Sequence, residues 1–192
     1  MTQLWWVRHA PTHEKSFVGW RDVPADLSDT AMIGRVADHL PAGAVIVASD
    51  LQRASTTADA IGGARHRLPD MPALREMDFG IWDGMDWRDV AARDPDLSRR
   101  FWEQPGDLRA PDGESWNDVS ARVARAVDDL TLRFAGRDIV LVAHMGVIMT
   151  QIQRASGSTA YQALGHQIDN LSVTRMARNG AGWTLGAVNH LP

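Results

Sequence analysis

The 192-residue chain contains no cysteine and only one lysine, Lys15. The lack of cysteine excludes disulfides, thiolate nucleophiles, cysteine-ligated zinc and iron–sulfur clusters. The other 19 of its 20 cationic side chains are arginines, whose planar forks suit phosphate and carboxylate groups. We attribute most of these arginines to codon usage in a GC-rich genome, so composition alone does not identify a ligand.

Positive charge and long hydrophobic runs are also lacking. The formal net charge is −4, so no basic excess indicates a nucleic acid or an anionic membrane as partner. The longest apolar stretches, at 42–48 and 139–143, fall far short of the ~20 residues of a membrane helix. The N-terminus lacks the basic and apolar regions of a signal peptide. We therefore expect a cytoplasmic protein that acts on a small molecule, and the sequence gives no indication of its oligomeric state.

Apolar periodicity predicts the elements of secondary structure. Strands are expected at 3–7, 44–48, 138–143, 171–176 and 182–188, the last two joined by a turn at Asn179-Gly180. Helices are expected at 30–40, 51–61, 115–134 and 147–155. Asp50 is the expected N-cap of the second helix, and Ser115 with Asp118 marks the start of the third.

Alternating strands and helices predict an α/β fold. Because the first three strands are short continuous apolar runs, we expect both faces of the sheet to be covered, in a three-layer α/β/α sandwich with a mostly parallel central sheet. The length suits a single domain of residues 1–192. The segment 69–113, rich in Asp, Trp, Gly and Pro, is expected to be a small lid-like insertion.

Ligands of open α/β sheets bind beyond the carboxyl ends of the strands. Arg8 and His9 follow the first predicted strand, Arg53 lies shortly after the second, and His144 follows the third. The arginines suit the oxygens of a phosphate ester, an imidazole is a competent nucleophile at phosphorus, and a second imidazole can stabilise the charge. A proton donor for the leaving alcohol completes the set, which calls for a carboxylic acid near the in-line position.

Five motifs in chain order resemble those of the histidine phosphatase superfamily (phosphoglycerate mutase-like). They are Val7-Arg8-His9-Ala10-Pro11-Thr12, Ser49-Asp50-Leu51-Gln52-Arg53 with Thr57-Ala58, Leu74-Arg75-Glu76 through Gly80 to Asp83-Gly84, Gly113-Glu114-Ser115, and Val142-Ala143-His144-Met145-Gly146. The endings Asn170-Leu171-Ser172 and Val188-Asn189-His190-Leu191 are also similar. The resemblance thus covers nearly the whole chain.

This resemblance implies a role for each matching residue. His9 would be the nucleophile that becomes phosphohistidine, and Glu76 would protonate the leaving alkoxide and then activate water. Arg8 and Arg53 would clamp the phosphoryl group, with His144 as the fourth member of the pocket. A weaker phosphate contact is implied for Thr12 and for the backbone after His144. No metal or organic cofactor is implied.

The chain departs from the family pattern at three points. Ala10 and Pro11 follow the nucleophile where glycine is usual, and Met145 follows His144 where glycine is common. Both changes are expected to narrow the mouth of the pocket. The polar residue, often Asn, that the family has further along the first loop has no clear match in 13–17.

Some residues admit a second interpretation. Asp78 is an alternative general acid to Glu76, since spacing alone does not decide between them. His9 and His13 are four residues apart, as in a metal site on a helix, but Pro11 disfavours a helix there. Asp83 and Glu114 are candidates for loop-holding hydrogen bonds. Surface or structural positions are expected for the remaining histidines, His39, His66, His166 and His190.

Eight tryptophans are many for this length. Trp5 and Trp6, in the first strand, are expected to lie in the core. A second group clusters in and after the irregular segment, namely Trp82, Trp87, Trp102 and Trp116 with Phe79 and Phe101. We expect this group to form a local core for the insertion, and the alternative is an aromatic lid that favours a flat or bulky leaving group.

The favoured function is hydrolysis of a small-molecule phosphate monoester, in the phosphatase branch of the family. The alternatives are a phosphoglycerate-type mutase and a non-catalytic relative that only binds phosphorylated ligands. The compact chain and the loop at 76–84 favour the phosphatase, with alpha-ribazole phosphatases the most similar group within it. Since His9 must be unprotonated and Glu76 protonated, we expect a bell-shaped pH profile with an acidic to neutral optimum.

Overall fold

The computed structural model describes residues 1–180 and 182–192. Within them, six strands form one sheet in the order β3-β2-β4-β1-β5-β6. The strands are β1 (Thr2–Arg8), β2 (Val45–Ala48), β3 (His66–Arg67), β4 (Asp138–Ala143), β5 (Val173–Asn179) and β6 (Gly182–Leu185). The first four in this order are mutually parallel, and β5 and β6 run antiparallel to their neighbours. The sheet is therefore mixed but mostly parallel, as expected.

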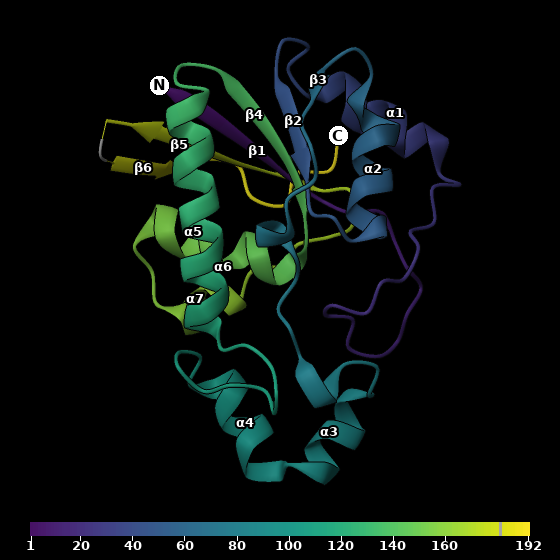
Figure 1. The fold of residues 1–192 in the computed structure, drawn as a ribbon, viewed down its shortest axis with the longest axis vertical. Coiled ribbons are helices and arrows are strands. Elements are labelled where there is room, and N and C mark those ends of the chain that lie inside the picture. Colours follow the sequence, from purple (N-terminus) through teal and green to yellow (C-terminus); the bar gives the residue numbers. More distant parts are fainter. Residues whose placement is uncertain (181) are drawn as a thin grey trace.

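Helices cover both faces of this sheet (Figure 1). Helices α1 (Thr30–His39) and α2 (Gln52–Gly62) lie on one face, and α5 (Trp116–Arg133) and α6 (Met145–Ser156) lie on the other, with the short α7 (Ala160–Leu164) against α6. Alternate residues of each strand enter opposite cores, because side chains alternate across a pleated strand. In β4, for example, Val140 and Val142 pack toward α1 and α2, whereas Leu141 packs toward α5 and α6. The three-layer α/β/α prediction is confirmed.

The N-termini of α5 and α2 are capped in different ways, α5 by residues next to it in the sequence and α2 by a residue from a distant loop. Ser115 and Asp118 form the expected capping box of α5. Asp50 is not the N-cap of α2, which begins one residue later after Leu51 without a side-chain cap of its own. The backbone N–H of Gln52 instead donates to Asp22, 2.7 Å away in another loop, while Asp50 binds Arg75 at 2.8 and 2.6 Å. A tertiary contact therefore replaces the predicted local one.

The C-terminal hairpin is shorter than expected. Asn179 pairs with Gly182, so the connection begins at Gly180, and its other residue, 181, lies outside the described residues. Gly180 has a φ of 60°, in the left-handed region that a tight hairpin favours. The last strand ends at Leu185 rather than at 188.

The segment 69–113 is more regular than the sequence indicates. It contains two 3-10 helices, η1 (Pro72–Leu74) and η2 (Gly80–Trp82), and two α-helices, α3 (Trp87–Arg93) and α4 (Pro95–Glu103). Figure 1 shows α3 and α4 beyond the end of the sheet. The backbone N–H of Ile81 donates to the carbonyl oxygen of Pro111 at 2.9 Å, so the chain returns to the place it left.

The tryptophans divide differently from the prediction. Trp6 is fully buried, whereas Trp5 is half-buried and packs at the edge of the core, with the Arg175 guanidinium 4.6 Å from its ring centroid. In the second group, Trp82 and Trp116 are buried and form the local core of the segment together with Phe101. Trp87 is 62% exposed and takes no part in that core. Phe79 and Trp102 are half-buried, which leaves their rings free to line a cavity.

No helix in the described part of the chain combines the length and the apolar character that a membrane span requires.

Candidate active site

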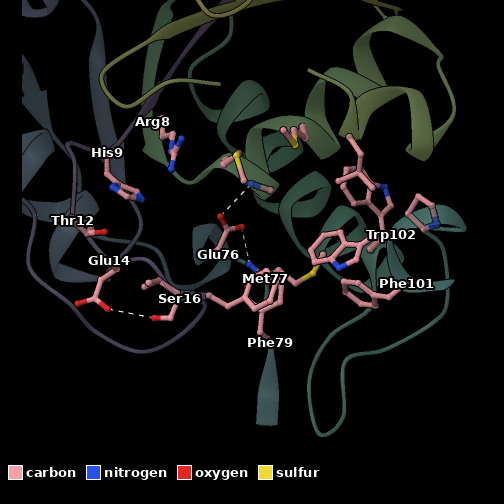
Figure 2. A pocket seen from close by; sticks show the side chains of 18 of the residues that line it. Arg8, His9, Thr12, Glu14, Ser16, Glu76, Met77, Phe79, Phe101 and Trp102 are labelled. Carbon is pink, nitrogen blue, oxygen red and sulfur yellow. Dashed lines mark hydrogen bonds between the residues drawn. The ribbon is translucent and has the colours of Figure 1, made fainter. Parts of the chain in front are cut away.

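The ends of three neighbouring strands bring the sequence-predicted residues together. Arg8 ends β1 and His9 follows it, Arg53 lies in the first turn of α2 after β2, and His144 is the N-cap of α6 after β4. Glu76 lies in the loop after η1 and faces these residues across the cavity (Figure 2). Figure 2 shows Arg8 and His9 facing one cavity with Glu76. We call Arg8, His9, Arg53 and Glu76 the charged end of this cavity.

His9 has a defined tautomer. Its Nδ1 lies 2.7 Å from the carbonyl oxygen of Ala10, and because a carbonyl only accepts, Nδ1 carries the proton. Nε2 is therefore the basic nitrogen. Burial, assisted by Arg53 and Arg8, lowers the pKa of His9 to about 3, although the bond to Ala10 opposes this shift. The ring is thus a neutral imidazole with a free lone pair.

Two side chains fix the backbone around His9. The Asn170 amide donates to the carbonyl oxygen of His9 at 2.7 Å, and the hydroxyl of Thr57 accepts from the N–H of Ala10 at 3.0 Å. Thr57 also donates to the carbonyl oxygen of Arg53, which links the first and second motifs. Neither residue has a role in the sequence prediction, although both lie within its motifs.

His144 lies beside His9 rather than on the cavity wall. The ring centroids are 5.1 Å apart, and His144 is fully buried. Neither of its ring nitrogens has a hydrogen-bond partner among residues 1–180 and 182–192. Burial, followed by the proximity of His9 and Arg53, lowers the pKa of His144 well below its ordinary value. The structure therefore places this imidazole, in its neutral form, behind the nucleophile.

Both arginines of the charged end are held by backbone carbonyls. Arg8 donates to Ile168 at 2.6 Å, and Arg53 donates to Gly19 at 2.7 Å and to Arg21 at 3.0 Å. In each guanidinium Nε is buried and has no partner among the described atoms. Burial lowers the pKa of both arginines. Two cationic donors that face one cavity, Arg53 buried and Arg8 half-buried, fit an anion such as a phosphoryl group.

Glu76 is held by backbone N–H groups. Met77 donates to Oε1 at 2.9 Å, and Gly146, at the start of α6, donates to Oε2 at 3.1 Å. A Cβ at Gly146 would lie 2.6 Å from Oε1, so this close approach requires glycine. Asp78 does not line the cavity and instead accepts a hydrogen bond from Gly80. Of the two candidate acids, the structure therefore brings Glu76 to His9.

The sequence prediction missed Arg122, which braces the backbone of Glu76. Its guanidinium donates to the carbonyl oxygens of Ala73, Arg75 and Glu76 at 3.0, 2.8 and 3.2 Å. It also forms an ion pair with Glu114 at 2.7 Å. The only available signal was a charged residue on the helix that follows the fourth motif.

Acidic residues hold the adjoining loops, as proposed from the sequence. Glu114 accepts from the backbone N–H of Asp78 at 3.0 Å. Asp83 accepts from the N–H groups of Gly19 and Arg21 at 3.1 and 2.9 Å, which ties the loop after β1 to the loop that carries Glu76.

The remaining predicted residues fall into two groups. Thr12 and Met145 line the cavity, and Ser16 lines it where the family's polar residue was missing from the sequence pattern. His13 is exposed and lies 2.7 Å from Asp26 rather than near His9. The described residues contain no group of three or more His, Cys, Asp or Glu side chains placed to hold a metal ion.

Comparison with known proteins agrees with this geometry. The model of the histidine phosphatase superfamily (branch 1) matches residues 4–191. The chain belongs to this superfamily. Its members are usually phosphatases or mutases, and membership alone does not fix which activity this chain has.

Individual relatives narrow the choice only partly. A bifunctional protein of Mycobacterium tuberculosis is 34% identical over 169 residues, which are 85% of this chain but 44% of that protein. The chain thus spans less than half the length of this curated relative. Among solved structures, Bacillus stearothermophilus YhfR superposes with a TM-score of 0.87 at 28% identity, over 98% of this chain and 96% of that one.

Two further structures are named for different substrates. The alpha-ribazole phosphatase from Shigella flexneri is 25% identical, with a TM-score of 0.84 over 98% of this chain and 96% of that one. A mycobacterial glucosyl-3-phosphoglycerate phosphatase is also 25% identical, with a TM-score of 0.84 over 97% and 98%. Because both are equally similar, overall similarity does not identify the substrate.

Proposed function

We propose that this protein hydrolyses small-molecule phosphate monoesters through a phosphohistidine intermediate on His9. The observation that carries the proposal is the state of His9, a neutral imidazole whose Nδ1 proton is committed to Ala10. The free Nε2 belongs to a cavity that also contains Arg8, Arg53 and Glu76. A nucleophile, two anion clamps and a proton carrier are together what transfer of a phosphoryl group requires.

In the first step Nε2 of His9 attacks phosphorus. The P–N bond forms as the bond from phosphorus to the alcohol oxygen breaks, and protonated Glu76 gives its proton to the departing oxygen. The guanidiniums of Arg8 and Arg53 stabilise the charge on the non-bridging oxygens. His144 packs beside the attacking ring.

In the second step water takes the phosphoryl group from His9. Glu76, now a carboxylate, accepts a proton as the oxygen of water bonds to phosphorus and the P–N bond breaks. The products are inorganic phosphate and neutral His9, so the site returns to its starting state. The N–H groups of Met77 and Gly146 hold the carboxylate in place through both steps.

Trapping of the intermediate tests this proposal. Enzyme quenched during turnover of 32P-labelled 4-nitrophenyl phosphate should carry acid-labile, base-stable label, and His9→Ala should carry none. Glu76→Gln should retain the label longer than the wild type, because hydrolysis of phosphohistidine lacks its base. His39→Ala, at an exposed position, is the matched control and should behave as the wild type.

Two other outcomes would support the alternative functions, a non-catalytic binding protein or a mutase. A wild type that binds inorganic phosphate but acquires no label is a non-catalytic binding protein. A label that passes to a second hydroxyl faster than to water indicates a mutase. Alpha-ribazole 5′-phosphate belongs in the substrate panel because one of the two equally similar structures described above is named an alpha-ribazole phosphatase.

A further inference from the structure

Among the described residues, five aromatic side chains line the cavity: the buried Phe101 and Trp116, which belong to the local core, and three half-buried side chains at the end opposite His9. Phe17 comes from the loop after β1, Phe79 from the loop that carries Glu76, and Trp102 from α4. We call these three residues the aromatic wall. Phe17 lies 5.0 Å from Phe79 and 5.8 Å from Trp102, centroid to centroid, and is nearly parallel to the latter at 18°. Figure 2 shows Trp102 and Phe79 on the far side of Glu76 from His9.

Backbone contacts hold the aromatic wall in place. The N–H of Phe17 donates to the carbonyl oxygen of Met85 at 3.0 Å, and its carbonyl oxygen accepts from Gly84 at 2.9 Å. A buried T-shaped contact at 4.8 Å with Phe101 supports Trp102. A surface that is ordered before binding loses little entropy when a ligand packs against it.

Charge is distributed unequally along the cavity. Among its described lining residues, Arg8 and Arg53 are the only cations, and both belong to the charged end. The other charged lining residues are Glu76 and the exposed Glu14. The nearby Arg21 does not line the cavity and is paired with Glu14 at 2.9 Å. An anionic group on the leaving alcohol would therefore lose water beside aromatic rings and a carboxylate without gaining a counterion.

We propose that the cavity selects phosphate monoesters of uncharged alcohols that carry a flat aromatic group, and rejects those whose alcohol carries a carboxylate or a second phosphate. The proposal rests on the function proposed above, and it assigns the aromatic wall as the determinant of specificity. The ring of the leaving group packs on the wall, while its phosphoryl group reaches His9. Glu14 and Ser16, at the polar side of the cavity, can accept hydrogen bonds from hydroxyl groups of the alcohol.

Substrates matched in leaving-group basicity test this selection. 2-Naphthylmethyl phosphate, glycerol 3-phosphate and 3-phosphoglycerate all release alkyl alcohols, so differences in kcat/KM report binding to the wall. We expect the naphthylmethyl ester to exceed 3-phosphoglycerate by about a hundredfold. Trp102→Ala should lower kcat/KM for the naphthylmethyl ester by about tenfold and leave that for glycerol 3-phosphate within about threefold. Trp87→Ala, an exposed tryptophan outside the cavity, is the control.

Two variants protect the test against misfolding. Phe79→Leu keeps an apolar side chain and should reproduce the effect of Trp102→Ala in a weaker form. Leu108→Arg adds a cation to the cavity lining and should raise kcat/KM for 3-phosphoglycerate by about tenfold. Equal use of the three esters, or a preference for 3-phosphoglycerate, overturns the proposed selection.

A binding measurement separates this proposal from the catalytic one. Calorimetry with 2-naphthylmethylphosphonate and 3-phosphonopropanoate, which cannot be hydrolysed, reports selection without turnover. Tighter binding of the aromatic phosphonate supports the aromatic wall even if no phosphohistidine forms. Equal binding of both compounds, alongside a trapped phosphohistidine, would leave the catalytic proposal standing and overturn this one.

Discussion

At the charged end of the cavity, Arg8 and His9 lie at the end of β1 and Arg53 lies in the first turn of the helix after β2, whereas the aromatic wall comes from two loops and a helix outside the sheet. The charged end therefore depends on the position of the strand ends, which a buried parallel sheet fixes. The aromatic wall depends on how a surface segment packs. This difference teaches that the chemistry of the site and its selectivity rest on separate parts of the molecule, joined at Glu76.

The largest expected effect comes from displacing Glu76, where the two parts of the cavity meet. Gly146→Ala would place a Cβ 2.6 Å from Oε1 of Glu76 and displace the carboxylate. We expect kcat/KM for alkyl phosphates to fall by about a hundredfold, but that for 4-nitrophenyl phosphate by less than about tenfold, because its leaving group needs little protonation. Gly34→Ala in α1, where a Cβ meets nothing within 4 Å, is the control. Equal losses of kcat/KM with both substrates would contradict the assignment of Glu76 as the general acid.

A smaller effect is expected at Arg122, which acts on Glu76 only through its backbone. Arg122→Lys can keep the ion pair with Glu114 but cannot satisfy three carbonyl oxygens together. We expect kcat/KM for alkyl phosphates to fall by about tenfold and that for 4-nitrophenyl phosphate to fall less, because its leaving group needs little protonation. Inhibition by inorganic phosphate should stay within about twofold of the wild type, because the charged end keeps both arginines.

Arg125→Lys, at an exposed position of the same helix, is the matched control for Arg122→Lys. If Arg122→Lys lowered stability but left the ratio of alkyl to nitrophenyl turnover unchanged, Arg122 would be a structural residue without influence on the acid.

The last prediction concerns stability at the charged end rather than turnover. The pKa of His9 is about 3 in the folded protein, below the ~6.5 of an unfolded histidine. Between these values the unfolded chain binds a proton that the folded protein does not, so the free energy of unfolding falls as pH falls. Urea titrations should show that His9→Gln reduces this fall by about 1.4 kcal/mol per unit between about pH 6 and pH 4. His66→Gln, exposed in β3, should not, and parallel curves for His9→Gln and the wild type would contradict the cause given for the shift.

Local patterns predicted the charged end well. The strands that end at Arg8, Ala48 and Ala143 are short apolar runs, and parallel strands end on one edge, so the residues after them had to meet. Ser115 with Asp118 was sufficient for the start of α5 because a capping box is satisfied within four residues. In both cases the deciding interactions are local or follow from the periodicity of a buried sheet.

Contacts between distant segments explain what the sequence did not predict. Asp22 rather than Asp50 caps α2, and Arg122 reaches a loop more than forty residues earlier. Helices α3 and α4 were missed because they are short, meet at Asp94-Pro95, and consist largely of polar residues. Only three-dimensional packing decides which Trp and Phe residues are buried in the core and which line the cavity, and Phe101 and Trp116 do both.

The hydrogen bond between Ile81 and Pro111 has a consequence for engineering. The segment 82–110 begins and ends at almost the same point of the domain, because its two flanking residues are hydrogen-bonded to each other. A segment of different length from a relative can therefore be inserted between these two residues while the strand ends stay where they are. Such chimaeras would exchange the part of the aromatic wall that Trp102 contributes, and they should retain Asp83, because it binds the loop whose carbonyl oxygens hold Arg53.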